Sequence, residues 1–232
     1  MKDKYSESWE IYKAHSEVFE DDFAYYLDFC KNHSALELFA GYGRLSNYLA
    51  KKGVDLFTVE LSQNFSDLIE IPSTNKIVAD VLEFSSEDRK WDRIFAGYNS
   101  FCLFTKEEDI KNFFMRLSEN LSNDGLASLN YYHVDYWKDA VEYEFEFKGK
   151  KVHYTPKFDL SERSNGIGVW IDKYNFEGKI YTHEYTVRVY EDSTDLEKFL
   201  NFANLKLVNE IKEFGRKNVM EPGWIDFVVS KK

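Results

Sequence analysis

The sequence has few of the residues that restrain small secreted proteins or build metal centres. It contains three prolines (Pro72, Pro156, Pro222) and two cysteines (Cys30, Cys102), with no CxxC pair and no Cys/His cluster. This excludes a disulfide framework and argues against a structural zinc site. With no low-complexity stretch and no internal repeat, a flexible linker between domains is not expected either.

Long apolar runs and an excess of positive charge are also missing. No run approaches 18 apolar residues, the opening MKDKYSESWE lacks the apolar core of a signal peptide, and 30 basic residues stand against 41 acidic ones. A formal charge of −11 disfavours general attraction to nucleic acid or to anionic membranes. We therefore expect a soluble, cytoplasmic protein with neither nucleic acid nor membrane as a partner.

The periodicity of apolar residues predicts a single α/β domain over the 232 residues. One or two helices open the chain at 9–30. Short strands at 35–40, 54–59, 76–79, 91–97 and 125–131 then alternate with helices at 44–52, 62–70 and 106–121, which is typical of a doubly wound parallel sheet. A helix near 194–203 and strands near 205–213 and 224–230 predict a terminal hairpin on the sheet edge, giving a seven-stranded, mostly parallel Rossmann-like fold.

The texture of the sequence changes after the fifth strand. Residues 136–190 hold aromatic and charged runs broken by Lys148-Gly149, Asn165-Gly166 and Glu177-Gly178, which are hairpin signals. We predict an antiparallel β insertion there, acting as a substrate lid or as a homodimer surface. The sequence leaves the oligomeric state open.

The stretch ALELFAGYGRLSNYLAKKGVDLFTVELSQNF (35–65) carries the clearest functional signal. Gly41 and Gly43 follow the first strand, where glycine permits positive φ and close approach of a ligand to the backbone. Glu60 ends the second strand at the same sheet edge, where its carboxylate suits two ribose hydroxyls. A tight turn beside a surface acid is the alternative interpretation, and the combination of both features argues against it.

Two nucleotides fit this pattern, a nicotinamide dinucleotide or S-adenosylmethionine (SAM). Glu37, at the end of the first strand, would repel a pyrophosphate but attract an α-ammonium group. Asp80, which closes the third strand, suits an adenine amino group. The chain also leaves too little length for a usual dehydrogenase substrate domain, so the sequence favours SAM.

Four segments resemble the successive motifs of class I SAM-dependent methyltransferases: LELFAGYGR (36–44), VELS (59–62), VADVLEF (78–84) and GYNSFCLF (97–104). The resemblance covers roughly residues 34–132, and the last two strands fit the family's antiparallel close. It departs from the family at Phe39, where glycine is usual, and at Arg44, where a third glycine or a similar small residue is common. It implies that Glu37 and Gly41 face the methionine end of SAM, Glu60 the ribose, Asp80 and Val81 the adenine, and Tyr98 the sulfonium. The predicted cofactor-binding set also includes Tyr12, Phe39, Ala40, Gly43, Arg44 and Leu61.

The position of the insertion resembles the small-molecule members that act on sugar nucleotides, the desosamine- and mycaminose-type N,N-dimethyltransferases. The segment NSFCLFTKEEDIKNFFMRLSENLSNDG (99–125) is similar to theirs. This implies methyl transfer to an amino or hydroxyl group of a small polar molecule, such as a sugar nucleotide. Four basic residues are then candidates to meet a diphosphate, with solvated strand charges as the default interpretation: Lys150, Lys151, Arg163 and Arg188.

The candidate catalytic residues are His133, His183 and Tyr98. An oxygen acceptor needs a base, for which His133 is the first candidate, whereas an amine needs only its neutral form; a loop histidine without catalytic role is an equal alternative. The predicted substrate contacts are Asn99, Tyr132 and Arg188. His183 and Arg188 are five residues apart and should point to opposite faces of their strand, and His15 is expected on the surface.

Two other classes of function stay open. One is a methyltransferase of the same fold acting on tRNA or protein, and the other is a non-catalytic interaction protein. Tyr98-Asn99-Ser100-Phe101 stands where base methyltransferases have Asn-Pro-Pro-Tyr, which counts against base methylation. The intact Gly41, Glu60 and Asp80 count against loss of catalysis.

Overall fold

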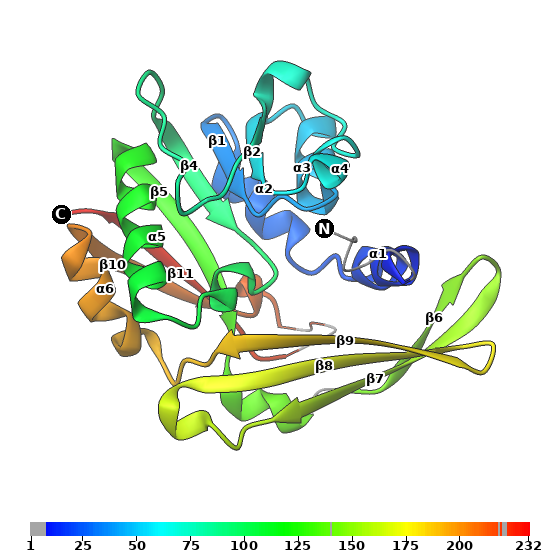
Figure 1. Cartoon of the computed structure of the whole chain (residues 1–232). Helices are drawn as coiled ribbons and strands as arrows, with labels where there is room; N and C mark the ends of the chain where they lie inside the picture. The colour runs from blue at the N-terminus through cyan, green and yellow to red at the C-terminus, as the bar shows by residue number, and fades with distance from the viewer. Residues whose placement is uncertain (1–7, 140, 218, 220–221) are drawn as a thin grey trace.

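Seven strands form one mixed sheet in the computed structural model, which describes residues 8–139, 141–217, 219 and 222–232. The strand order is β10-β11-β5-β4-β1-β2-β3 (Figure 1). The five strands β1 to β5 pair in parallel, and β11 runs antiparallel to both β5 and β10. The bounds are β1 (Ser34–Leu38), β2 (Asp55–Glu60), β3 (Lys76–Val78), β4 (Trp91–Ala96), β5 (Leu121–Tyr132), β10 (Leu205–Lys212) and β11 (Trp224–Lys231). The predicted seven-stranded Rossmann-like fold is confirmed.

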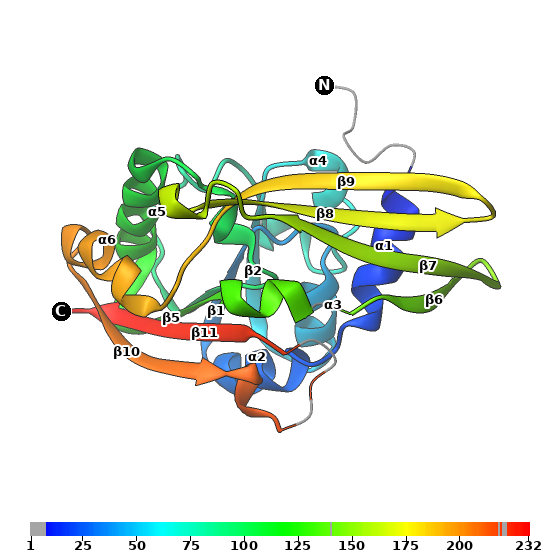
Figure 2. The ribbon, with the colours of Figure 1, turned by 90° about the horizontal axis from the view of Figure 1, so that it is seen from below.

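Helices cover both faces of this sheet because its strands are apolar on both sides. Successive strand residues point to opposite faces, so Ala35 packs with Tyr26 and Leu45, whereas Leu36 belongs to the core that contains Phe113. The first face is covered by α2 (Phe23–Cys30) and α3 (Arg44–Lys51), and the second by α5 (Glu107–Asn120) and α6 (Glu197–Phe202) (Figure 2).

Two elements differ from the sequence prediction for identifiable reasons. The helix expected at 62–70 is the short α4 (Gln63–Ser66), and the chain then turns so that Ile69 is buried beside Gly43. Strand β5 begins at Leu121, four residues before the predicted start, because a bulge opposite Trp91 absorbs the turn-like residues 122–125.

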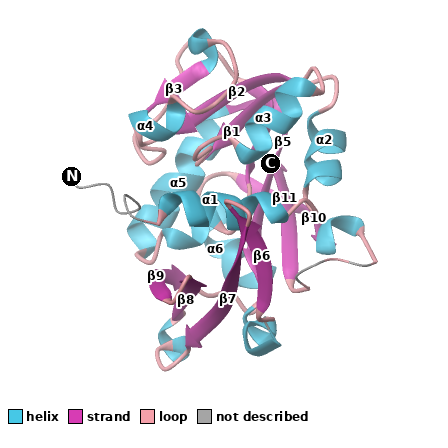
Figure 3. Ribbon diagram, turned by 90° about the vertical axis from the view of Figure 1, so that its right-hand side faces the viewer, coloured by secondary structure: helices cyan, strands magenta, loops and turns pink. Residues whose placement is uncertain are grey.

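The insertion forms a second, four-stranded antiparallel sheet: β6 (Tyr143–Phe147), β7 (Lys150–Asp159), β8 (Ile167–Phe176) and β9 (Lys179–Arg188). Lys148-Gly149 and Glu177-Gly178 make two-residue turns with positive φ at all four residues, as predicted. Asn165-Gly166 instead ends a longer connection that contains a short 3₁₀ helix, η4 (Arg163–Asn165). We call these four strands the insertion sheet; Figure 3 shows it beside the main sheet.

Helix α1 (Trp9–Val18) lies against the insertion sheet rather than on the main sheet (Figures 1 and 3). The remaining short 3₁₀ helices connect strands and helices: η1 (Ser73–Asn75), η2 (Ser100–Leu103), η3 (Val134–Asp139), η5 (Ser193–Leu196) and η6 (Glu213–Gly215). None of the helices within the described ranges has the length and apolar character needed to cross a bilayer.

Candidate active site

The turn after β1 is built around two glycines and one carboxylate. Gly41 and Gly43 have φ of 56° and 90°, and a Cβ on Gly43 would lie 3.0 Å from Asn47 Oδ1. The Gly41 amide donates to Glu60 Oε2 at 2.8 Å, and the Ser62 amide donates to Glu60 Oε1 at 2.8 Å. Two backbone donors thus fix the Glu60 carboxylate at the edge of the sheet, beside the turn.

Backbone strain concentrates at the carboxyl ends of β1 and β4. Phe39, Tyr98 and Asn99 have φ of 56°, 58° and 60°, a region that side chains with a Cβ rarely occupy. Phe39, which stands where a glycine was expected, keeps this conformation because its ring packs against Phe104 at 5.6 Å and Phe113 at 5.8 Å between centroids. The strained positions lie together on the edge that the sequence marks as functional.

Glu37 is a buried acid behind the glycine turn. Its side chain accepts a hydrogen bond from Ser46 Oγ, and its residue surface is 4% exposed. Burial raises the pKa of Glu37 to about 8, and the Ser46 hydroxyl and the Arg44 charge oppose that rise. A cationic ligand group would therefore find here a carboxyl group ready to ionise.

One cavity of about 550 Å³ joins this edge to the insertion sheet. Three parts of the chain line it: the edge of the main sheet, with the turns and loops after β1, β2, β3 and β4, the end of β5 and the start of β11; helix α1; and the inner face of the insertion sheet. Its volume lies within the range usual for cofactor and substrate sites. Two elements that the nucleotide half does not supply, α1 and the insertion sheet, thus cover the cavity.

Helix α1 is attached to the insertion sheet through His15. The His15 ring forms hydrogen bonds with Tyr143 at 2.5 Å (Nε2) and with Tyr174 at 2.8 Å (Nδ1). Burial, with a smaller contribution from His183, lowers the pKa of His15 to about 3, so the ring is neutral. Since a neutral imidazole has one donor and one acceptor, one tyrosine donates to it and the other accepts. The expectation of a surface histidine is wrong, because α1 carries His15 into the cavity wall.

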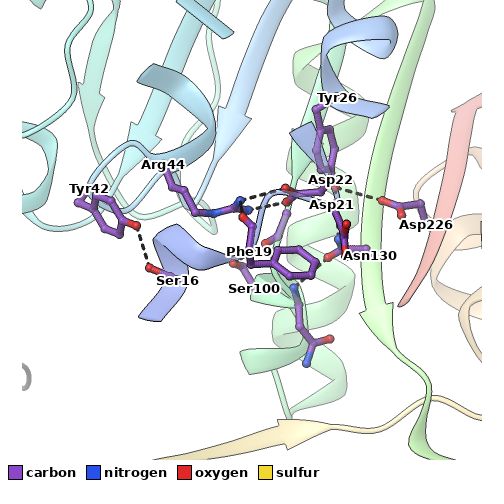
Figure 4. A network of polar contacts seen from close by, with 12 residues as sticks. Ser16, Phe19, Asp21, Asp22, Tyr26, Tyr42, Arg44, Ser100, Asn130 and Asp226 are labelled. Carbon is purple, nitrogen blue, oxygen red and sulfur yellow. Dashed lines mark hydrogen bonds and ion pairs between the residues drawn. The ribbon is translucent and has the colours of Figure 1, made fainter. Parts of the chain in front are cut away.

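Arg44 is the one cationic side chain among the described lining residues, and its charge is paired with Asp22 (Figure 4). Its Nη1 and Nη2 donate to Asp22 Oδ1 at 2.9 Å and Oδ2 at 2.5 Å, and Nη1 also donates to the Phe19 carbonyl at 2.7 Å. The guanidinium lies 5.4 Å from the Tyr98 ring centroid. Arg44 therefore anchors the segment between α1 and α2 and leaves no free positive charge for an anionic ligand.

The inner face of the insertion sheet contributes a carboxylate. Asp172 on β8 is 5% exposed, and its Oδ1 accepts hydrogen bonds from Trp170 Nε1 at 2.7 Å and from the Tyr154 hydroxyl at 2.8 Å. Burial raises the pKa of Asp172 to about 6 against the opposing effect of these two donors. Tyr185 on β9 also faces the cavity.

Most of the predicted site residues meet at the cavity. Those that line it are Tyr12, Glu37, Phe39, Ala40, Gly41, Arg44, Glu60, Leu61, Asp80, Val81, Tyr98, Asn99 and Tyr132. Gly43 does not line it but shapes the turn. Asn99 holds the ends of β4 and β5 together, because its amide donates to Asn130 Oδ1 at 2.9 Å and its Oδ1 accepts from the Tyr132 amide at 3.2 Å.

Three predicted catalytic or substrate-binding residues lie outside the lining. His133 turns away after β5, where its amide donates to the Gly223 carbonyl at 2.8 Å and its Nδ1 accepts from the Asp135 amide at 3.2 Å. His183 lies on the inner face of β9 but behind the lining, with Nε2 hydrogen-bonded to Ser8 Oγ and a ring contact to Tyr12. Arg188 packs under Gly166. The cavity wall does not supply either histidine as a base in direct contact with a bound acceptor.

The basic residues expected at a diphosphate also lie outside the cavity. Lys150 pairs with Glu177, Lys151 with Glu144 at 2.6 Å, and Arg163 of η4 with Glu191 at 2.5 Å, and the side chains of all three pairs are exposed to solvent. These pairs are the solvated charges of the default interpretation.

Sequence reasoning missed the residues that the insertion and the chain ends bring to the site. They are Trp9, His15, Ser16, Tyr154, Trp170, Asp172, Tyr185, Val187 and Trp224. The sequence holds a weak signal in β8, where a period of two places Gly168, Trp170, Asp172 and Tyr174 on one face with Asp172 as its one acid. Which face of an inserted sheet covers the site depends on how the two sheets pack, and no pattern along one strand encodes that.

The strand order and the inserted sheet define the fold of class I SAM-dependent methyltransferases. No family model and no curated protein matches the sequence. Among solved structures, the chain is similar to a SAM-dependent methyltransferase from Clostridium acetobutylicum ATCC 824 (TM-score 0.70, 19% identity, 99% of each chain covered). It is also similar to the sugar N-methyltransferase KedS8 from Streptoalloteichus sp. ATCC 53650 (0.70, 14%, 96% of this chain and 92% of that one). A third is CalS10, an amino pentose methyltransferase from Micromonospora echinaspora with SAM bound (0.74, 11%, 100% of both).

Proposed function

We propose that this protein is a SAM-dependent methyltransferase that acts on an amino or hydroxyl group of a small polar molecule. The observation that carries the proposal is one continuous cavity, in which the Gly41–Glu60 edge continues into a space covered by α1 and the insertion sheet. The names of the neighbouring structures, which include SAM-dependent and sugar N-methyltransferases, support it.

The residues on the sheet edge fit SAM group by group. Each Glu60 oxygen accepts one backbone N–H, and a carboxylate oxygen can accept further bonds, so both oxygens can also take ribose hydroxyls. Asp80 is held by the Leu82 amide at 2.9 Å and lines the cavity where an adenine amino group would bind. Buried Glu37 suits the α-ammonium group. A dinucleotide fits less well, because the described lining offers its pyrophosphate no unpaired cation.

SAM supplies a methyl group on a sulfonium, ready for in-line displacement. The chain's part is to hold the acceptor opposite that methyl group and to exclude water. Aromatic side chains suit this task, since their faces tolerate a poorly hydrated positive charge. Tyr98, stacked on Trp224 at 5.7 Å between centroids, and Tyr132 supply such faces between the two halves of the cavity.

The cover that α1 and the insertion sheet form over the cavity favours a small acceptor over a macromolecule. Trp9 and Tyr12 from α1 and Trp170 from the insertion sheet line the cavity opposite the sheet edge. A tRNA base or a protein side chain would have to enter between these elements. The net charge of −11 on the chain would in addition repel the phosphate backbone of tRNA. Within small molecules, the neighbours' names favour an amino sugar. The described lining offers no free cation to a diphosphate. If the sugar is linked to a nucleotide, the diphosphate therefore lies outside the cavity.

The test is transfer of labelled methyl from SAM to separated acceptor pools: a metabolite extract, tRNA, and denatured protein. We expect label in the small-molecule pool, with S-adenosylhomocysteine formed in equal amount. Label in tRNA or protein alone would refute a small acceptor. No labelled product from any pool, together with absent SAM binding, would refute the methyltransferase assignment.

A further inference from the structure

We propose that the acceptor is an amine that enters the cavity as a cation and that Asp172 is the residue that binds its ammonium group. This inference rests on the proposed function and narrows its acceptor from amino or hydroxyl groups to amines. Its basis is the arrangement around Asp172 on the inner face of the insertion sheet.

The two oxygens of Asp172 have different roles. Oδ1 is occupied by Trp170 Nε1 and the Tyr154 hydroxyl, which fix the orientation of the carboxylate. Oδ2 receives no hydrogen bond from any described residue and is not sealed from solvent, so it is open to the cavity. A buried carboxylate with one oxygen fixed and the other open is arranged for a ligand that donates hydrogen bonds and carries positive charge.

Aromatic rings surround this carboxylate. Trp170, Tyr154 and Tyr185 line the same part of the cavity, and Trp170 makes an edge contact with Tyr132 at 5.4 Å between centroids. Rings stabilise cations through their faces and leave a neutral hydroxyl without a comparable partner. The ring faces and the acid together select an ammonium group over an alcohol of the same shape.

The charge of the whole lining agrees with this selection. Glu37, Glu60, Asp80 and Asp172 are acidic, whereas Arg44 is neutralised by Asp22 and His15 is uncharged. Within the described lining an anionic acceptor would therefore meet four carboxyl groups and no free cation, and a cationic acceptor would meet only favourable charge.

Asp172 also lies within reach of the cofactor half. Trp170, which donates to Asp172, contacts the Tyr132 ring at 5.4 Å between centroids, and Tyr132 in turn contacts Trp224 at 5.2 Å. Trp224 stacks on Tyr98, on the sheet edge, and Tyr98 and Asp172 line the same cavity. An amine bound at Asp172 is therefore in the cavity that the sheet edge also lines.

Methyl transfer to the amine needs no group beyond the amine itself, SAM and the Asp172 carboxylate. The ammonium passes one proton to Asp172 Oδ2, and the freed lone pair on nitrogen forms a bond to the methyl carbon. The bond from that carbon to sulfur breaks, and its electron pair leaves with sulfur. The product is a methylammonium ion, and the proton on Asp172 returns to solvent. An additional base such as His133 is not required.

Other titratable groups face Asp172, and their effects on the pH profile must be distinguished from the effect of Asp172. Tyr154 comes from β7, His183 is its direct cross-strand partner on β9 with Tyr185 next to it, and His15 from α1 bonds Tyr174. The ammonium binds only to ionised Asp172, so kcat/KM should fall as the pH drops below about 6, the pKa to which burial raises this acid. Replacing Tyr154 by Phe removes a donor that lowers this pKa, and the fall should move to higher pH.

The experiment measures binding by calorimetry to protein saturated with S-adenosylhomocysteine. The probes are D-glucosamine, ethanolamine and benzylamine, each beside its neutral counterpart, D-glucose, ethylene glycol or benzyl alcohol. Wild type is compared with Asp172→Asn, which keeps the shape, and with Glu184→Gln, which removes an exposed acid from the outer face of β9. Methylation of the best probe is then followed against pH in wild type, Asp172→Asn, Tyr154→Phe and His183→Gln.

We expect at least one amine to bind about tenfold tighter than its counterpart, with the preference lost in Asp172→Asn and kept in Glu184→Gln. S-adenosylhomocysteine affinity should be unchanged in both. The fall of kcat/KM at low pH, the acid limb of the profile, should vanish in Asp172→Asn and persist in His183→Gln. Equal binding of amines and counterparts, binding of no probe, or an acid limb that follows His183 would each overturn the inference while leaving the cofactor assignment intact. Absent S-adenosylhomocysteine binding would overturn the proposed function as well.

Discussion

Replacing Glu60 by Gln tests the cofactor edge with the least change in shape. In the structure each carboxylate oxygen accepts one backbone N–H, from Gly41 and from Ser62, and Glu60 lines the cavity. An amide has one acceptor oxygen, so one backbone N–H loses its partner in the free and the bound protein alike. The difference in cofactor affinity comes from the ribose, because one of its hydroxyls no longer has a charged acceptor. A hydrogen bond to a charged group contributes about 1.5–3 kcal/mol, which corresponds to about 10- to 150-fold weaker binding.

Calorimetry with S-adenosylhomocysteine, which is not consumed, measures this effect. Glu83→Gln is the matched control, since Glu83 is exposed and does not line the cavity. Urea unfolding of all three proteins shows whether Glu60→Gln is still folded. An affinity within twofold of wild type in a folded Glu60→Gln protein would show that Glu60 does not hold the ribose.

Four further predictions concern charge and position. The α-ammonium of SAM should ionise Glu37, whose pKa burial raises to about 8, so binding at pH 7 should release a proton; calorimetry in buffers of different ionisation enthalpy should detect this, and Glu37→Gln should abolish it. Arg44→Lys loses the two-pronged contact with Asp22 and should lower the free energy of unfolding in urea by about 1–3 kcal/mol. His133→Ala should change kcat/KM less than about twofold, because His133 lies outside the cavity and methyl transfer to an amine needs no further base; a loss of about 100-fold would reinstate it as the base. His15 resists protonation in the folded protein, whereas in the unfolded chain it binds a proton below about pH 6.5. The free energy of unfolding should therefore fall by up to about 1.4 kcal/mol per pH unit as the pH drops from 6.5 towards 3. Urea unfolding of His15→Gln should show a flatter slope.

The main sheet and the cofactor edge are predictable from the sequence because local patterns encode them. A strand that is apolar on both faces, followed by Gly41 and Gly43 and a helix with Leu45 and Leu49 on one side, has few alternative structures. Glu60 then reaches the same edge, since parallel strands end together. The errors there are shifts of element ends caused by local packing, as at Ile69.

The acceptor half is less predictable because distant segments build it. Asp172 and His183 are direct cross-strand partners on the same face of the insertion sheet, yet only Asp172 reaches the cavity. His15 looks like a surface residue in its own helix and is buried only because two insertion-sheet tyrosines receive it. Periodicity gives the face of each residue, while the packing of α1 and the two sheets decides which of those faces meets the ligand.

The most direct test of the central claim is a calorimetric titration of the wild-type protein with SAM, S-adenosylhomocysteine and NAD⁺ under one set of conditions. The account predicts one-to-one binding of SAM and of S-adenosylhomocysteine and no heat of binding with NAD⁺. Binding of NAD⁺ with no response to either sulfur compound would contradict it.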